Sequence, residues 1–557
     1  MLMSANAGKQ TNWQRQREVR DARLEAGAKF ARGKIVEARD TTRLMEAVIR
    51  PGDRVCLEGD NQKQADHLSR ALLAVDLTKV NDLHMVQSGV VLPEHLDLFE
   101  RGVAKKLDYA YSGPQSERIA RMLFGGKIQL GAVHTYLELF ARYFIDLTPN
   151  VALIAAVSAD REGNLFTGPN TEDTPTVVEA TAFKDGVVIA QVNEIVDRVP
   201  RVDIPADRVH FIVKSDKSFF VEPLFTRDPA AITEGQILTA MLAIKGIYGP
   251  YGVQRLNHGI GFSTAAIELL LPTFGEALGL KGKIASHFAL NPHPALIPAI
   301  ESGWVQQIHS FGSEVGMDEY IRARSDIYFT GADGSLRSNR AFSQTAGLYA
   351  TDMFIGSTLQ IDLQGNSSTV TTSRIAGFGG APNMGSDARG RRHPSAPWLK
   401  AGEEADPESP ALLRRGRKLV VQIGETFGDK NVSLFVEKLD AIELAEKLKL
   451  DLAPVMIYGD DVTHIVTEEG IANLLLCRSA VEREQAIRGV AGYTDVGRRR
   501  DRNVVERLRQ RGVIIRPEDL GINPLDADRN LLAARSIKDL VHWSGGLYAP
   551  PSKFRNW

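Results

Sequence analysis

From about Thr42 onward, the apolar positions of this chain alternate between two spacings. Short and nearly continuous apolar runs occur at Arg54–Glu58, Val151–Val157 and Gly186–Val192. Such runs predict strands covered on both faces, as in parallel sheets. Between them apolar residues recur every three or four positions, as in Gln64–Ala74, which predicts amphipathic helices. The alternation of strands and helices predicts an open α/β sheet.

The same pattern restarts in the second half of the chain. A helix at Thr233–Ile244 closes the first half, and a strand at Gln254–Leu256 precedes a helix at Thr264–Leu271. Further strands are predicted at Lys283–Ser286, Ile327–Thr330, Leu359–Gly365, Lys418–Ile423 and Ala453–Tyr458. We therefore expect two open α/β domains in tandem, with largely parallel sheets. Their predicted limits are a charged N-terminal arm (1–41), a first domain (42–245) and a second domain (246–557) with an exposed excursion near 381–417.

Two glycine-rich turns lie more than a hundred residues apart. Gly259-Ile-Gly-Phe262 opens a predicted helix, and Gly377-Phe-Gly-Gly380 follows the alternating run Leu359–Gly365. Because glycine has no Cβ, such turns can adopt positive φ and bring backbone N–H groups close to a ligand. These donors suit a phosphate or a developing oxyanion. One glycine turn often does no more than reverse the chain, so the prediction of a site depends on the pair.

Composition narrows the class of protein. The chain has 557 residues, 43% of them hydrophobic and 24% charged, with a net charge of −2. This length exceeds one hydrophobic core, and the charge argues against general nucleic-acid binding. The two cysteines, Cys56 and Cys477, provide neither a disulfide framework nor a thiolate metal cluster. No apolar stretch approaches the roughly 20 residues that span a bilayer, so we expect a cytoplasmic protein without a metal site.

Several segments together resemble the CoA-transferase superfamily. They are Val188–Asn193, Gly259–Phe262, Leu359–Gly365, Gly377–Gly380 and Val462–Leu474. Within that superfamily the whole chain is similar to the alpha subunits of biotin-independent malonate decarboxylases, to which the citrate lyase alpha subunit is related. The resemblance implies two CoA-transferase-like α/β domains. It also implies an acyl-carrier-protein transferase that converts acetyl-S-carrier and malonate into malonyl-S-carrier and acetate.

The resemblance carries implications for cofactors and partners as well. It implies no cofactor held covalently by this chain. A CoA-like phosphoribosyl-dephospho-CoA arm would be delivered by an acyl carrier protein subunit. Decarboxylase subunits would complete a complex, neither nucleic acid nor membrane would be a partner, and a homodimer is one option for the assembly.

The sequence departs from the superfamily at the expected nucleophile. Glutamate-dependent CoA transferases carry a catalytic glutamate after the strand that follows the first glycine turn, and His287 occupies the corresponding position here. Glu301 and Glu314 lie nearby in sequence, but neither is predicted at a strand end that faces the glycine turns. Without that glutamate, the resemblance implies that one substrate attacks the other directly, through a mixed anhydride.

The candidate residues follow from these motifs, and each also has a purely structural interpretation. The side-chain amide of Asn193 either donates to the carbonyl oxygen of the substrate, or Asn193 is a turn residue at a strand end. His287 either hydrogen-bonds the substrate carboxylate or is a core histidine. The predicted catalytic residues are Asn193, His287, Gly379 and Gly380. The predicted substrate-binding residues are Gln191, Gly259, Ile260, Gly261, Phe262, Arg374, Gly377, Phe378 and Asn383.

Arg374 could pair with a substrate carboxylate or the pyrophosphate of a CoA-like arm, although a solvated arginine is the commoner case. The clusters Arg498–Arg500 and Arg414–Lys418 are either docking points for an acidic carrier protein or ordinary solvated runs. Two alternative functions stay open from the sequence. One is a glutamate-dependent CoA transferase or acetyl-CoA hydrolase that acts on free CoA thioesters, and the other is a silent scaffold subunit.

Overall fold

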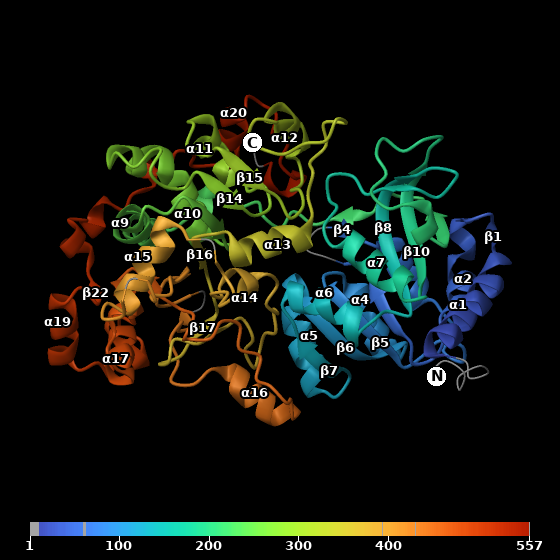
Figure 1. Ribbon diagram of the computed structural model, residues 1–557, viewed down its shortest axis with the longest axis horizontal. Coiled ribbons are helices and arrows are strands. Elements are labelled where there is room, and N and C mark those ends of the chain that lie inside the picture. The colour runs from blue at the N-terminus through green and yellow to red at the C-terminus, as the bar shows by residue number, and fades with distance from the viewer. Residues whose placement is uncertain (1–10, 60–62, 393, 411, 429–430, 556–557) are drawn as a thin grey trace, which may run out of the picture. The chain divides into compact units, whose positions relative to one another are not determined.

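A computed structural model describes residues 11–59, 63–392, 394–410, 412–428 and 431–555. The chain folds into two compact units, Met1–Glu222 and Pro223–Trp557 (Figure 1). The second unit thus begins before the predicted boundary at 245/246. The reason is that helix α8 (Glu234–Ala243) places Ile237 and Ala240 in the hydrophobic core of the second unit.

The first unit is built on one large sheet, in the order β1-β2-β11-β10-β8-β3-β5-β6-β7 with β9 beside β8. All pairs from β2 to β7 are parallel, while β1–β2 and β8–β9 are antiparallel. The strands are β1 (Ala31–Arg32), β2 (Ile35–Val36), β3 (Arg54–Leu57), β4 (Lys63–Gln64), β5 (Leu83–Gly89), β6 (Ala104–Tyr111), β7 (Gln129–Val133), β8 (Val151–Ala159), β9 (Leu165–Phe166), β10 (Val187–Ile195), β11 (Phe211–Lys214) and β12 (Phe220–Val221). The helices are α1 (Asn12–Ala28), α2 (Thr41–Val48), α3 (Asp66–Leu73), α4 (Pro93–Arg101), α5 (Ser116–Phe124), α6 (Tyr136–Ile145) and α7 (Thr174–Phe183).

The predicted N-terminal arm is an integral part of this unit over its described residues. Arg23 of α1 is buried and donates to both carboxylate oxygens of Asp53, at 2.5 and 2.9 Å, and to the carbonyl oxygen of Val48 at 2.9 Å. Gly27 lies so close to Phe211 that a Cβ at this position would be 2.5 Å from its ring. The helix is therefore docked on the sheet and is not a solvated arm. Residues 1–10 of the predicted arm lie outside the described residues.

The second unit contains a sheet in the order β15-β14-β13-β16-β19-β20-β21-β22. It is parallel from β15 to β20 and antiparallel beyond. The strands are β13 (Arg255–His258), β14 (His287–Ala289), β15 (Gln307–His309), β16 (Met353–Gly356), β17 (Gln360–Ile361), β18 (Ser367–Ser368), β19 (Leu419–Ile423), β20 (His464–Thr467), β21 (Gly470–Asn473) and β22 (Ile514–Ile515). Besides α8, the helices are α9 (Gly249–Tyr251), α10 (Phe262–Leu270), α11 (Ile297–Glu301), α12 (Asp318–Ala323), α13 (Arg340–Tyr349), α14 (Ala381–Met384), α15 (Ala396–Ala405), α16 (Asp440–Leu448), α17 (Ala480–Val490), α18 (Asp495–Arg498), α19 (Arg502–Gln510) and α20 (Ile537–Trp543).

Apolar layers cover both faces of the second sheet. Because successive strand residues point to opposite faces, Ile355 of β16 joins the core that contains α8 and α10, whereas Phe354 joins a second core with Met384 and Ile457. The near-continuous apolar strands are therefore covered on both sides. The prediction of tandem α/β units with largely parallel sheets is confirmed.

The predicted excursion near 381–417 is exposed in part, as at Leu412 (95%) and Leu413 (74%), but other parts of it are packed on the unit. Arg391 is buried, donates to the carbonyl oxygen of Thr351 at 3.1 Å and lies 3.6 Å from the carboxylate of Asp352. Trp398 of α15 is 7% exposed and packs so closely on Gly416 that a Cβ there would clash with its ring. This segment covers the amino-terminal end of β16, since Asp352 immediately precedes that strand.

Four predicted strands differ in the structure. Residues 359–365 contain only the two-residue strand β17, because the Asp362 side chain accepts from the N–H groups of Gln364 and Asn366, both at 2.9 Å, and folds the chain into a turn. Residues 327–330 and 453–458 form turns and isolated bridges instead of strands. The predicted strand 283–286 is a turn with Ala285 at φ +54°, and β14 begins only at His287.

Among the helices of the described residues, none combines the length and the apolar composition that a bilayer crossing requires.

Candidate functional site

The second sheet reverses its direction of winding between β13 and β16. From β13 the chain continues to β14 and β15 on one side, then returns to β16 on the other side of β13 and continues to β19 and β20. In open α/β sheets, ligands bind outside the carboxyl ends of the strands at such a switch point. The turn Gly259–Gly261 directly follows β13, so it lies at this position.

The glycine turn is shaped by the close approach of the two central strands. The N–H of Gly259 donates to the carbonyl oxygen of Ile355 at 2.7 Å, and a Cβ on Gly259 would lie 2.9 Å from the Cα of Gly356. Only glycine fits there without displacing backbone. The Thr264 hydroxyl donates to the carbonyl oxygens of Gly259 and Gly261, at 2.7 and 3.1 Å, which fixes the turn against the first turn of α10.

Helix α10 begins at Phe262, directly after the turn. The N–H groups of the first helical turn have no partner within the helix, and this helix starts four residues after the carboxyl end of β13. Such N–H groups attract a carboxylate or a developing oxyanion. The predicted residues Gly259, Ile260, Gly261 and Phe262 are thus brought together at the switch point.

A buried acid–histidine network lies behind this turn. One carboxylate oxygen of Glu268, on α10, lies 2.9 Å from Nδ1 of His258 and 2.8 Å from Nδ1 of His293. Burial opposes ionisation of Glu268, but the charge and hydrogen bonds of the two histidines outweigh it and lower its pKa to about 2. Burial lowers the pKa of His258, whose Nε2 lies 2.8 Å from the Tyr248 hydroxyl. The network holds the end of β13 and the start of α10 in a fixed arrangement.

Glu314 lies on the same edge of the sheet, in the loop that follows β15. The sequence did not predict it at a strand end that faces the glycine turns, and the structure places it five residues after β15, which is two strands away from β13. Its Oε1 accepts from the N–H and hydroxyl of Thr226, at 3.1 and 2.9 Å, and its Oε2 accepts from the N–H of Phe225 at 3.2 Å. Burial raises the pKa of Glu314 to about 7. The next residue along that segment, Arg227, places its guanidinium 5.8 Å from the ring centre of Phe262.

His287 is not brought to the glycine turn. It is the first residue of β14 and pairs with Arg255, the first residue of β13. Both therefore lie at the amino ends of parallel strands, opposite the edge where Gly259 lies. The prediction placed His287 after a strand, but the preceding residues form a turn. We assign it no catalytic role.

The second glycine turn packs on a different face from the first. Gly377 and Gly379 have φ of +77° and +58°, and Gly380 caps α14 so close to Gln344 that a Cβ would lie 2.3 Å from its amide. Phe378 packs against the core that contains Phe354, on the side of the sheet away from α10. These glycines shape the contact between α13 and α14, so the expectation that both glycine turns line one crevice is not supported.

Two further predicted residues accompany this second turn. Asn383 is buried on α14. Arg374 is exposed at the tip of a tight turn in which the N–H of Thr371 donates to its carbonyl oxygen at 2.7 Å. Their predicted roles in substrate binding stay predictions.

Gln191 and Asn193 lie on β10 of the first unit. The buried Gln191 side chain accepts from the N–H of Leu68 at 3.2 Å and donates to Asp66 at 3.0 Å, so it anchors the start of α3. The side-chain oxygen of Asn193 accepts from the N–H of Phe219 at 2.9 Å. The Asn193 amide N–H₂ has no hydrogen bond within the described residues, which is compatible with its predicted role as a donor.

The first sheet has a switch point of its own, between β3 and β8. Glu58 follows β3 and accepts from the N–H of Ala155 at 2.7 Å, and Nζ of the fully buried Lys63 lies 3.3 Å from its other oxygen. Nζ of Lys63 also lies 2.5 Å from the Thr174 hydroxyl. Sequence reasoning missed this buried ion pair. The feature of the sequence that could have indicated it is an acidic residue followed by a glycine, Glu58-Gly59, directly after an apolar strand.

Known proteins resemble this chain over nearly its whole length. The family model described as malonate decarboxylase, alpha subunit, transporter matches residues 12–557. A curated acetyl-S-ACP:malonate ACP transferase from Malonomonas rubra is 63% identical over 95% of this chain and 96% of its own length. A chain of a Pseudomonas malonate decarboxylase hetero-tetramer, crystallised in complex with malonate, is 59% identical with a TM-score of 0.96, over 99% of this chain and 100% of that chain.

Two further solved structures extend the comparison. The malonate decarboxylase alpha subunit from Acinetobacter baumannii is 54% identical, with a TM-score of 0.94 over 97% of this chain and 100% of that chain. An acyl-CoA transferase from Escherichia coli O157:H7 shares only 14% identity over 80% of this chain and 88% of that chain, with a TM-score of 0.51. That likeness concerns the fold alone, and it confirms the predicted CoA-transferase-like architecture.

Proposed function

The chain belongs to the malonate decarboxylase alpha-subunit family, and we propose that it is an acyl-carrier-protein transferase that exchanges acetyl for malonyl on a carrier thiol. The observation that carries this proposal is the 63% identity, over 95% of the chain, to an acetyl-S-ACP:malonate ACP transferase. The donor would be acetyl-S-carrier and the acceptor malonate, with acetate as the product. The thiol would belong to a phosphoribosyl-dephospho-CoA arm on the carrier, which enters as substrate. Decarboxylase subunits would then act on the malonyl thioester, in the cytoplasm.

The proposed reaction proceeds in two balanced steps. One carboxylate of malonate attacks the acetyl thioester carbonyl, forming a C–O bond and releasing the carrier thiolate, which yields an acetyl–malonyl anhydride. The thiolate then attacks the malonyl carbonyl, forming the new thioester and releasing acetate. One thioester replaces another, so the protein must mainly hold the reactants together and exclude water from the anhydride.

The switch point of the second sheet provides donors for this chemistry. Each step passes through a tetrahedral oxyanion, which backbone N–H groups of Gly259–Gly261 and the first turn of α10 would stabilise. A single preorganised donor is worth about 3 kcal/mol in such sites. The Glu268–histidine network and Thr264 hold these donors in place before substrate binds.

Glu314 raises a second route, in which an enzyme glutamate first takes the acyl group as an anhydride. Its place at the carboxyl edge of the sheet favours this alternative. Its hydrogen bonds favour the direct route, because Thr226 and Phe225 already occupy both carboxylate oxygens. In addition, a pKa of about 7 leaves a large share of this carboxyl protonated at neutral pH. We therefore propose direct transfer.

Both the exchange activity and the direct route can be tested by mixing the purified protein with acetylated carrier protein and labelled malonate. Mass spectrometry of the carrier should show malonyl replacing acetyl, and absence of this exchange would overturn the proposed activity. Borohydride or hydroxylamine added during turnover should leave Glu314 unmodified, and Glu314→Gln should keep transfer within about tenfold of the wild-type rate. An acyl adduct on Glu314, together with loss of transfer in Glu314→Gln, would establish the glutamate route instead.

A further inference from the structure

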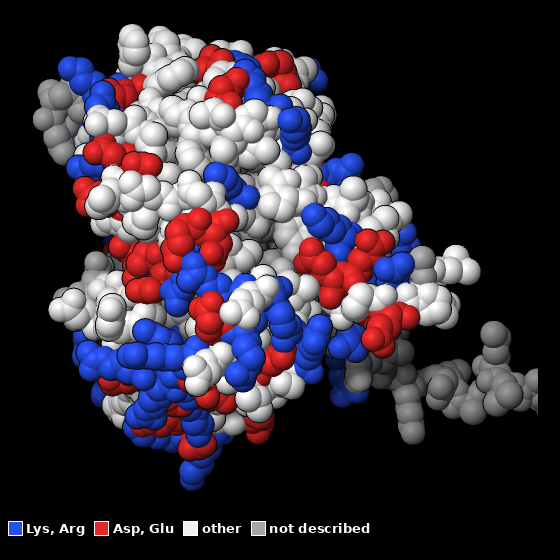
Figure 2. Space-filling model, turned by 90° about the vertical axis from the view of Figure 1, so that its left-hand side faces the viewer, with Lys and Arg blue, Asp and Glu red and all other residues white. Residues whose placement is uncertain are grey.

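Arginines are concentrated at the end of the second unit that carries α18 and α19. Residues 498–511 contain seven arginines (498, 499, 500, 502, 507, 509 and 511) and two acids (Asp501 and Glu506), a local charge of 7 − 2 = +5 in a chain whose net charge is −2. Figure 2 shows basic side chains gathered on the lower part of the face that it presents. The excess of positive charge is therefore local to one surface.

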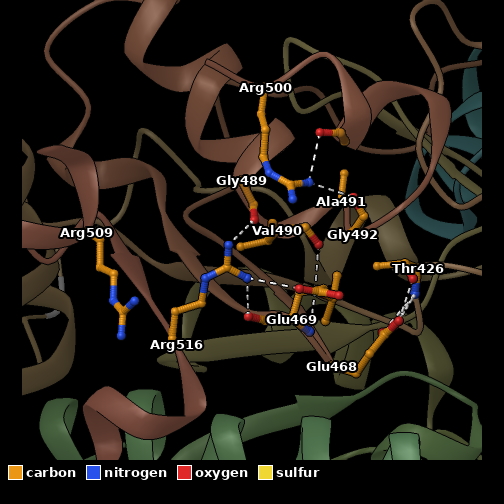
Figure 3. Close-up of polar contacts among 12 residues, drawn as sticks. Thr426, Glu468, Glu469, Gly489, Val490, Ala491, Gly492, Arg500, Arg509 and Arg516 are labelled. Atoms are coloured by element: carbon orange, nitrogen blue, oxygen red, sulfur yellow. Dashed lines mark hydrogen bonds and ion pairs between the residues drawn. The ribbon is translucent and has the colours of Figure 1, made fainter. Parts of the chain in front are cut away.

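Some of these arginines serve the fold of the unit. Arg500 donates to the carbonyl oxygens of Gly492 and Gly497, at 2.9 and 3.0 Å. Nearby, Arg516 donates to the carbonyl oxygens of Glu469 and Gly489, at 2.7 and 3.0 Å, and so clamps the turn between β20 and β21 (Figure 3). Arg499, Arg509 and Arg511 form ion pairs with acidic residues of the same unit.

Three arginines remain without such a role. Arg498, Arg502 and Arg507 are exposed, and none of them forms an ion pair or a side-chain hydrogen bond within the described part of the chain. Tyr493, two residues before α18, is 71% exposed. Exposed arginine with an aromatic side chain is the composition that protein interfaces favour. We call Arg498, Arg502 and Arg507 the α19 arginine surface.

The other basic cluster predicted as a docking point, residues 414–418, makes contacts within the unit. Arg415 and Arg417 both pair with the buried Asp387, at 3.0 and 3.4 Å. Lys418 is fully buried and donates to the carbonyl oxygen of Gly347 at 2.6 Å. Arg415, Arg417 and Lys418 are therefore engaged within the unit, whereas the arginines of the α19 arginine surface form no such contacts within the described residues.

We propose that the α19 arginine surface docks an acidic acyl carrier protein during transfer. This inference rests on the proposed function and adds the place where the partner binds. Charge complementarity is the reason for this occupant: unpaired arginines attract an acidic protein, speed its encounter and release it again, as a carrier that visits several subunits requires. Nucleic acid fits less well, since acids are interspersed and the chain as a whole is slightly negative.

The test compares two triple variants of the full chain. Arg498→Glu with Arg502→Glu and Arg507→Glu reverses the surface, and Arg502→Glu lies in the first turn of α19, where a negative charge suits the helix. Arg39→Glu with Lys105→Glu and Arg161→Glu makes the same charge change at exposed positions of the first unit. Calorimetry measures the Kd for acetylated carrier protein at about 0.05 M and about 0.3 M salt, conditions under which screening of exposed charges differs strongly.

The surface variant should bind the carrier about tenfold or more weakly at low salt and lose most of the salt dependence. Its KM for the acetylated carrier should rise while kcat stays unchanged, and the control variant should match the wild type in all of these values. Equal Kd values for all three proteins would overturn the proposal. It would also be overturned if the surface variant lost binding of a decarboxylase subunit or of duplex DNA while binding of the carrier stayed unchanged. A wild type that binds the carrier without exchanging acetyl for malonyl would instead overturn the proposed function.

Discussion

The backbone N–H of Gly259 donates to the carbonyl oxygen of Ile355 at 2.7 Å, so β13 and β16 stay hydrogen-bonded up to the residue where the glycine turn begins. The two central strands of the second sheet are thereby closest at the point where the winding reverses. A side chain at position 259 would separate them.

Gly259→Ala should destabilise the protein by about 1–3 kcal/mol, the usual cost of forcing extra atoms into a packed site. Its Cβ would lie 2.9 Å from backbone that cannot move freely. Displacement of the oxyanion donors should also slow transfer by about tenfold or more. Gly261→Ala is the matched control for packing, because the nearest atom to its Cβ would be the Ser357 hydroxyl oxygen, at 3.3 Å, and no backbone atom is as close. Urea unfolding measures both variants, and equal losses of stability would contradict the argument. Initial rates of transfer are compared between Gly259→Ala and the wild type.

Glu268→Gln should destabilise the protein by about 3 kcal/mol at pH 7, because the folded state lowers the pKa of Glu268 to about 2. A depressed carboxyl pKa contributes stability that is fully present above about pH 4.5 and is lost as the pH falls toward 2. The difference between wild type and variant should therefore shrink by half or more between pH 7 and pH 3. Urea unfolding at both pH values measures it, and a constant difference would refute this account of the network.

The contribution of Glu314 to stability should depend on pH in the opposite direction, since burial raises the pKa of its carboxyl to about 7. The folded state then holds this proton more tightly than the unfolded chain. Its contribution to stability is fully present below about pH 4.5 and is lost as the pH rises through 7. Relative to wild type, Glu314→Gln should gain about 3 kcal/mol of unfolding free energy between pH 4.5 and pH 8. A parallel pair of stability curves over this range would show that the carboxyl is ionised throughout.

Arg23→Ala should destabilise the first unit by about 3–5 kcal/mol, because it leaves the buried carboxylate of Asp53 without its bidentate partner. Arg17→Ala is the control on the same helix. The Arg17 side chain is 60% exposed and lies 3.5 Å from Asp185, so its removal should change stability by about 0.5 kcal/mol or less. Thermal unfolding measured by circular dichroism distinguishes the two, and similar effects would mean that α1 is not docked through Arg23.

Much of the fold could be predicted from the chain itself, because burial on both faces imposes long apolar runs. Such runs predicted the strands at 54–57, 151–159, 187–195 and 419–423. The sequence also predicted helices α3, α8 and α10. Errors arose where a local hydrogen bond prevailed over the pattern. The Asp362 side chain turned an alternating run into a loop, and the turn at Ala285 moved the start of β14 to His287.

The candidate site divides in the same way. The turn Gly259–Phe262 was predictable as a connection between a strand and a helix. Its place at the switch point of the sheet depends on the strand order, which the local sequence does not show. The importance of Glu314 was not, since nothing in the local sequence shows that Thr226, far away along the chain, satisfies its carboxylate. Nor could the sequence show which basic cluster is paired within the unit, because residues 414–418 and 498–500 are both short runs of basic residues.

The sequence by itself determined the tandem α/β architecture and the first glycine turn, because these depend on short-range patterns of apolar residues and glycine. Its likeness to known proteins over nearly the whole chain determined the family. Only the tertiary structure decided which edge of the sheet each candidate occupies, which faces the two glycine turns pack against, and which arginines remain unpaired. Those properties depend on strand order and on partners distant in sequence, and no local pattern encodes them.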